Sequence, residues 1–148
     1  MPYFTRQIDA KGLLVNIVFN VSAARASALT LAKQPIPSIF NAQGILDTGA
    51  SCTCIDPSVI AALGIPPTGK ATMVTPSTGE GEVIVDQYDI GLAIYSTLDK
   101  PPLRFASLPV VESNLLARQG FHALIGRDVL SQCILNYSGA DGTYILAF

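Results

Sequence analysis

The fold is decided by one stretch of the sequence, Gly44-Ile45-Leu46-Asp47-Thr48-Gly49-Ala50-Ser51. Two apolar residues end a strand, and an acid, a threonine and a glycine follow at once. Asp, Thr and Gly all favour turns, so a strand that ends in a polar turn would account for the triplet alone. The apolar residues before the triplet and the Ala-Ser pair after it make the string far more specific, and they single out the carboxylate of Asp47.

A second informative stretch lies near the other end of the chain, Ala123-Leu124-Ile125-Gly126-Arg127-Asp128-Val129-Leu130. Between the two stretches the sequence predicts a hairpin, with strands over Ala71–Val74 and Glu82–Ile90. The hairpin has a tip rich in turn-forming residues: Thr75, Pro76, Ser77, Thr78, Gly79, Glu80 and Gly81.

In this order and spacing, the stretches resemble the catalytic loop, flap hairpin and Gly-Arg-Asn/Asp segment of the retropepsin-like aspartic proteases, a family of retroviral proteases and bacterial relatives. The resemblance covers Phe40 to Tyr137. It implies a mostly β fold for residues 1–148, a single domain built as a closed barrel with a flap hairpin and one to three short helices. It also assigns roles to residues of this chain: Asp47 is catalytic, Thr48, Gly49 and Ala50 support the catalytic loop, residues 75–81 form the flap that binds substrate, and Gly126, Arg127 and Asp128 are structural near the site.

The resemblance implies hydrolysis of peptide bonds in extended polypeptides. Hydrolysis without a metal or a covalent nucleophile needs an activated water and a proton donor. Two adjacent carboxylates supply the base that activates the water and the acid that donates the proton, because the two do not both ionise. The pair of aspartates in aspartic proteases is the known example. The sequence holds a single Asp-Thr-Gly, so we expect a C2 homodimer in which Asp47 meets its own copy. The apolar end, Tyr144 to Phe148, is the expected interface strand.

Asp128 admits two interpretations. It is either a catalytic partner of Asp47 within one chain or the N-cap of a helix that begins at Val129, with Arg127 bracing the catalytic loop; the capping geometry favours the N-cap. Ser51 stands where many viral relatives carry an acid that pairs with this arginine, so the partner of Arg127 stays open. We expect His122, beside an apolar run, to be a structural or surface residue.

The rest of the chain predicts many short strands and little helix. Strands are expected at Leu13–Val21, Ile39–Leu46, Gly91–Tyr95, Phe105–Val111, His122–Ile125, Cys133–Tyr137 and Thr143–Phe148, in addition to the flap strands. Helices are expected at 22–33, with Ser22 as N-cap, and at 56–64, where Asp56 caps the start, Pro57 occupies the first turn and Gly64 ends it.

Composition excludes several classes of function. The chain has 148 residues, 14% of them charged, and a net charge of −2, so it has no basic excess for binding nucleic acid. Its mean hydropathy of +0.43 is high, which indicates apolar surface covered by a partner. No apolar run approaches the length of a membrane span. Residues 11–28 have the order of a signal peptide, but Asn16 and Asn20 interrupt the apolar run, so we expect a cytoplasmic protein without membrane contact.

The possible metal ligands of the cysteine and histidine type are too few and are not spaced as in a metal site. They are Cys52, Cys54, Cys133 and one histidine. We therefore expect no metal and no cofactor, and we expect all three cysteines to be small buried apolar residues. The odd number of cysteines agrees with a reducing compartment. Two alternatives to a protease stay open: a catalytically silent peptide-binding or dimerisation module of the same fold, and a metal or redox protein that uses the cysteines.

Overall fold

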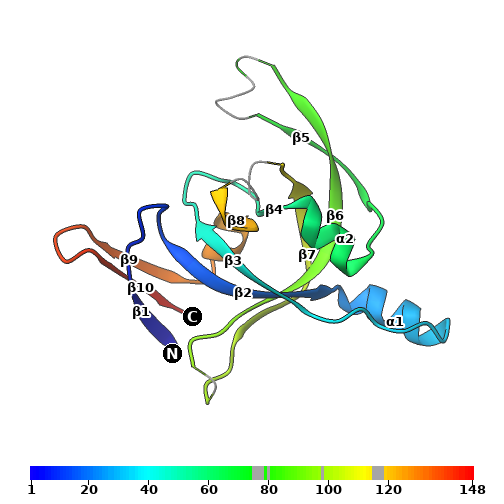
Figure 1. Ribbon diagram of the computed structural model, residues 1–148, viewed down its shortest axis with the longest axis horizontal. Helices are drawn as coiled ribbons and strands as arrows, with labels where there is room; N and C mark the ends of the chain where they lie inside the picture. The colour runs from blue at the N-terminus through cyan, green and yellow to red at the C-terminus, as the bar shows by residue number, and fades with distance from the viewer. Residues whose placement is uncertain (75–78, 80, 98, 115–118) are drawn as a thin grey trace.

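Ten strands and three short helices make up the part of the chain that the computed structural model describes, residues 1–74, 79, 81–97, 99–114 and 119–148 (Figure 1). In chain order they are β1 (Tyr3–Gln7), β2 (Leu14–Val21), α1 (Ala23–Leu31), β3 (Phe40–Leu46), β4 (Cys54–Ile55), α2 (Pro57–Leu63), β5 (Gly69–Met73), β6 (Val83–Ile94), β7 (Leu103–Glu112), β8 (Ala123–Ile125), α4 (Arg127–Leu130), β9 (Ile134–Ser138) and β10 (Thr143–Ala147).

Six of these strands close into a barrel in the order β2-β3-β8-β4-β7-β6, and pairing between β2 and β6 completes the ring. The β3–β8 and β4–β7 pairs are parallel and the other pairs are antiparallel. Side chains that alternate along β2, β6 and β7 fill the interior, as a strand with one buried face requires. The mostly β barrel with short helices predicted from the sequence is confirmed.

The helix boundaries follow the capping residues. The Ser22 hydroxyl accepts a hydrogen bond from the Arg25 N–H at the start of α1. The Asp56 carboxylate caps α2, Pro57 is its first residue, and Gly64 ends it in the left-handed conformation, with φ of 58°. These caps are as predicted. Helix α1 buries none of its residues and projects away from the barrel (Figure 1).

A separate three-stranded sheet, in the order β1-β10-β9, gathers both ends of the chain beside the barrel (Figure 1). The sequence did not predict β1. It pairs with β10 from Tyr3 opposite Ala147 to Gln7 opposite Thr143. Because β10 is paired on both sides within its own chain, its backbone cannot add a strand from a partner chain; whether its exposed face forms an interface stays a prediction. The free edges of this sheet belong to β1 and β9 among the described residues.

The flap hairpin consists of β5 and β6, which are antiparallel, with Met73 opposite Val83 nearest the tip. Of the predicted tip, Thr75, Pro76, Ser77, Thr78 and Glu80 lie outside the described residues, and Gly79 has a φ of +63°.

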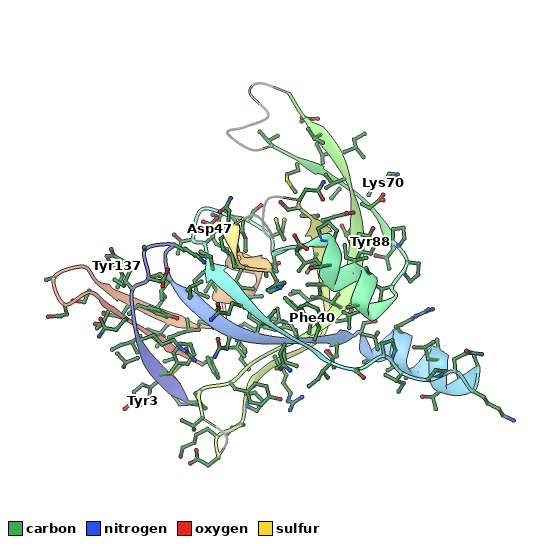
Figure 2. The ribbon with its side chains drawn as sticks, in the orientation of Figure 1. Tyr3, Phe40, Asp47, Lys70, Tyr88 and Tyr137 are labelled. Carbon is green, nitrogen blue, oxygen red and sulfur yellow. The ribbon has the colours of Figure 1, made fainter. Side chains whose placement is uncertain are left out.

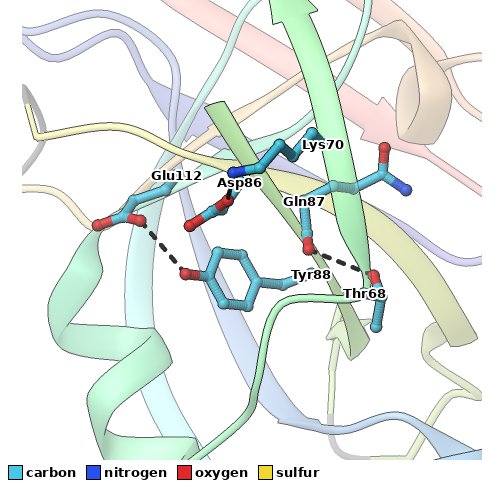
Figure 3. A network of polar contacts seen from close by, with 6 residues as sticks. All are labelled: Thr68, Lys70, Asp86, Gln87, Tyr88 and Glu112. Carbon is cyan, nitrogen blue, oxygen red and sulfur yellow. Dashed lines mark hydrogen bonds and ion pairs between the residues drawn. The ribbon is translucent and has the colours of Figure 1, made fainter. Parts of the chain in front are cut away.

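Polar contacts hold the root of the flap (Figure 3). Lys70 Nζ lies 2.7 Å from Asp86 Oδ1, directly across the two flap strands. The Tyr88 hydroxyl donates to Glu112 Oε2 at 3.4 Å, which ties β6 to the end of β7. Burial, with the nearby Glu112 carboxylate, raises the pKa of Tyr88, so this hydroxyl stays protonated and keeps donating at neutral pH. These contacts join β5 to β6 and β6 to β7 at the root of the flap.

Candidate active site

Strand β3 delivers Asp47 to the end of the barrel. Its last residue, Leu46, pairs in parallel with Ile125 of β8, and the Asp47 N–H donates to the Ile125 carbonyl at 2.9 Å. The backbone then turns sharply, because the Ala50 N–H donates to the Asp47 carbonyl at 3.3 Å. The Asp47 side chain is half-buried and sits at the end of β3 (Figure 2). Its position is therefore fixed by the barrel itself.

The Gly49 N–H donates to Asp47 Oδ1 at 2.8 Å. A Cβ at position 49 would lie 3.1 Å from the same oxygen, so a larger residue would crowd the carboxylate that this N–H contacts. Thr48 and Gly49 are exposed at the apex of the loop. The supporting role of the Thr48 side chain in the catalytic loop stays a prediction.

Arg127 braces the catalytic loop from the second stretch. Its Nη1 donates to the Thr48 carbonyl at 2.8 Å and to the Gly49 carbonyl at 3.2 Å. Its N–H donates to the Ala50 carbonyl at 2.9 Å. The partner of Arg127 is therefore the backbone of the catalytic loop. Arg127 binds carbonyl oxygens of this loop, whereas many viral relatives have an acid at the position of Ser51 to pair with it.

Asp128 contacts the chain that follows the catalytic loop and not Asp47. Its Oδ2 accepts from the Thr53 N–H at 2.8 Å, and its Oδ1 accepts from the Thr53 hydroxyl at 2.8 Å and the Val129 N–H at 2.9 Å. The predicted N-cap role is wrong, because α4 begins at Arg127, two residues before Val129, with Gly126 as its N-cap and no side-chain cap. Asp128 lies in the first turn, where a negative charge also suits the helix dipole.

Thr53 is a site residue that the sequence analysis missed. It is fully buried, and its hydroxyl accepts from the Gly126 N–H at 3.2 Å while it donates to Asp128. A threonine flanked by two cysteines carries no sequence signal of this role, since its partners lie more than 70 residues away.

Gly126 allows the two loops to cross. A Cβ there would lie 2.6 Å from the carbonyl carbon and 2.7 Å from the carbonyl oxygen of Cys52. Contacts that short with backbone atoms cannot be relieved by a side-chain rotation, so position 126 requires glycine. The predicted structural residues Gly126, Arg127 and Asp128 therefore all lie against the segment from Thr48 to Thr53.

The three cysteines are only partly as expected. All are free thiols, but Cys54 alone is buried, whereas Cys52 and Cys133 are half-exposed. Cys52 precedes β4 in a bend at the rim of the barrel, which leaves its side chain partly open to solvent. The Cys54 thiol donates to the Cys52 carbonyl at 3.9 Å. The proximity of the two side chains lowers the pKa of Cys52 to about 7 and, together with burial, raises that of Cys54.

His122 lies away from this chemistry. Its ring packs edge-on against Phe40 with centroids 5.3 Å apart, and its backbone bonds Gln43 and Asp56. In the described parts of the chain, no three His, Cys, Asp or Glu side chains gather where they could hold a metal ion, and no helix is long and apolar enough to cross a membrane.

Among the residues that the structure describes, the site thus presents one carboxylate, Asp47, on a braced loop beneath a hairpin. One carboxylate can accept a proton from water, but it cannot at the same time donate one. A hydrolysis that uses both steps would need a second acid, and Asp128 is engaged with Thr53 and Val129.

Comparison with known proteins bears on this geometry. A protein-family model described as aspartyl protease matches residues 41–135, more than half of the chain. The chain is similar in fold to a retropepsin-like aspartic protease from Rickettsia conorii, with a TM-score of 0.56 and 13% identity over 97% of this chain and 89% of that one. A foamy viral protease-reverse transcriptase, solved with an RNA/DNA hybrid, matches with a TM-score of 0.46 and 16% identity over 80% of this chain and 12% of that one. No curated protein sequence matches.

Proposed function

Because the chain belongs to the aspartyl protease family, in its retropepsin-like branch, we propose that it is an aspartic endopeptidase active as a homodimer with one Asp47 from each chain. The observation that carries the proposal is the half-buried Asp47 carboxylate at the start of a loop that Arg127 braces. The barrel fixes its backbone, Gly49 binds one of its oxygens, and Arg127 holds the loop.

A two-fold axis beside the Thr48–Gly49 apex would bring two Asp47 carboxylates together. The terminal sheet supplies apolar surface suited to such an assembly. Tyr3, Ile134 and Ile145 lie on one face of it by strand register, and Tyr3 and Ile134 are 63% and 60% exposed. Exposed apolar side chains gathered on one face favour a protein partner, and a second copy of the chain would cover them.

In the proposed reaction, an extended peptide binds as an added strand between the dyad and the two flaps. One Asp47 takes a proton from the attacking water while the other, protonated, donates to the scissile carbonyl. The tetrahedral intermediate then collapses with proton transfer to the leaving amine. These steps call for no cofactor. The free thiols of all three cysteines support our further proposal that the protein works in the cytoplasm.

A mixing experiment tests the shared site. Wild-type chains and Asp47→Asn chains are refolded together in equal amounts, and cleavage of an unstructured polypeptide is measured. Random pairing gives about one quarter intact dimers, so activity falls to about a quarter of that of the same total amount of wild-type protein. Asp47→Asn alone is expected to be inactive but folded, since the amide is nearly isosteric.

Other outcomes point elsewhere. A fall to one half would show that each chain works alone, and a second acid of the same chain would have to complete the dyad. A wild-type protein that binds peptides and dimerises without cleaving them would support the silent module. Sedimentation that shows only monomer together with full activity would contradict the shared site.

A further inference from the structure

A hollow lies between α1 and the strands β2, β6 and β7 of the barrel. Its volume is about 410 Å³, within the range of about 300 to 1,000 Å³ that is typical of sites for small organic molecules. Neither the catalytic loop nor the described part of the flap contributes a residue to its lining. The hollow is therefore a feature of the molecule that the proposed cleavage reaction does not use.

Small side chains keep this space open. Ala23 and Ala26 line it from α1, and Ala93 and Ala106 line it from β6 and β7. Helix α1 is nine residues long and buries none of them, although a helix this short depends on packing of one face for most of its stability. The hollow is thus a gap between a helix and the barrel that the side chains of the described residues do not fill.

Arg104 gives the hollow a permanent positive charge. It stands in register with Ala93 and Val18 across β7, β6 and β2, and all three line the hollow. Its Nη2 donates to the Tyr95 hydroxyl at 3.2 Å, and its guanidinium carbon lies 5.8 Å from the centre of the Tyr95 ring. This contact uses one N–H of a group that has several. Within the described ranges, no carboxylate forms an ion pair with Arg104, and no Asp or Glu lines the hollow.

We propose that this hollow binds a small amphipathic carboxylate, a molecule with one carboxylate and an apolar body of the size of a medium-chain fatty acid. The carboxylate accepts hydrogen bonds from Arg104, whose planar guanidinium matches its two oxygens. The apolar body lies against Ala26 of α1 and against Ile39, whose side chain is 58% exposed, and it removes their apolar surface from water. The ligand thereby supplies the packing that α1 lacks, and its binding does not depend on the proposed protease activity.

A neighbouring hollow of about 380 Å³ provides a contrast within the same molecule. It shares Val18 and Tyr95 with the first, but its polar side chains have no permanent charge. They are three amides and an imidazole, besides the Tyr95 hydroxyl: Asn16, Asn41, Gln43 and His122. Volume alone would make the two hollows similar sites. The charge of Arg104 and the uncovered face of α1 are what assign the carboxylate to the first.

Calorimetric titration of the full chain with octanoate tests the proposal, with octanol as the uncharged ligand of the same length. The protein carries Asp47→Asn, which keeps cleavage out of the measurement. We expect each chain to bind a single octanoate saturably, and octanol to bind about 10-fold more weakly, because only the carboxylate makes charge-assisted hydrogen bonds to Arg104. Absence of saturable octanoate binding, or equal affinities for octanoate and octanol, would overturn the proposal.

Variants in the same background locate the site. Ala26→Leu fills the hollow from α1, so it should weaken octanoate binding at least about 10-fold while the Tm stays the same or rises. Its matched control is Ala24→Leu on the same helix, which is exposed and does not line the hollow and should bind octanoate like the parent protein.

Arg104→Gln removes the charge at the hollow. It should weaken octanoate binding about 10-fold and leave octanol binding unchanged. Octanoate binding that survives both Ala26→Leu and Arg104→Gln would place the ligand elsewhere and overturn the site. Equal loss of binding in Ala24→Leu and Ala26→Leu would overturn it as well, because the effect would then belong to the helix and not to the hollow.

Discussion

Replacing Asp128 tests whether this acid has a structural role or a catalytic one. In the structure this carboxylate accepts three hydrogen bonds, two from Thr53 and one from the Val129 N–H. Hydrogen bonds to a charged group contribute about 1.5 to 3 kcal/mol each, and a buried donor left without a partner costs about 1 to 3 kcal/mol. Thr53 is fully buried, whereas Asp128 is partly exposed, which lowers the contribution of its charge.

We therefore expect Asp128→Ala to lower the free energy of unfolding by about 3 to 5 kcal/mol. For a chain of this length that is a fall of about 10 °C in Tm. Asp128→Asn should cost less, because its amide oxygen keeps part of the contacts. Urea unfolding at one fixed chain concentration measures both, since the proposed dimer would make apparent stability depend on concentration.

A double-mutant cycle with Thr53→Val checks that the effect arises at this contact. The valine keeps the shape of threonine but removes its hydroxyl, and the two sites should couple by about 1 to 2 kcal/mol. Cleavage should persist in Asp128→Asn at temperatures where it is folded, whereas Asp47→Asn should be inactive with undiminished stability. An Asp128→Asn protein that unfolds like wild type but cleaves nothing would refute the reasoning and make Asp128 a participant in the chemistry.

Two glycine substitutions test the loops directly. Gly126→Ala places a methyl group 2.6 Å from the Cys52 carbonyl carbon and should cost more than about 3 kcal/mol of stability or prevent folding. The control is Gly69→Ala, whose methyl group meets nothing within 4 Å and should change stability by less than about 0.5 kcal/mol. Equal melting temperatures for the two variants would contradict the close crossing of the loops at Gly126. Gly49→Ala places a methyl group 3.1 Å from Asp47 Oδ1, and it should lower kcat at least 10-fold while the Tm stays near that of wild type. Unchanged kinetics would show that the contact between the Gly49 N–H and Asp47 has no part in turnover.

The sequence predicted most of what local chemistry determines. The caps at Ser22 and Asp56 and the stop at Gly64 depend on neighbours only two to four residues away, and the structure has them as predicted. The Asp47 loop was found because the residues that mark it, from Gly44 to Ser51, are consecutive in the sequence.

What the sequence could not predict depends on distant partners. Thr53 acts through Asp128 and Gly126, far along the chain. The start of α4 at Arg127 was missed because Asp128 suits an N-cap locally, but its oxygens are occupied across the site. Cys52 was expected to be buried by composition, yet its exposure is set by where the chain bends before β4.

The brace that Arg127 forms has a consequence for acid conditions. Its acceptors are the carbonyl oxygens of Thr48 and Gly49, which take up no proton in the range where carboxylates titrate. In a relative with an acid at the position of Ser51, acidification would neutralise the arginine's partner and loosen the loop. Here the Arg127 brace contains no carboxylate, so acidification does not remove the acceptors that hold the apex of the loop.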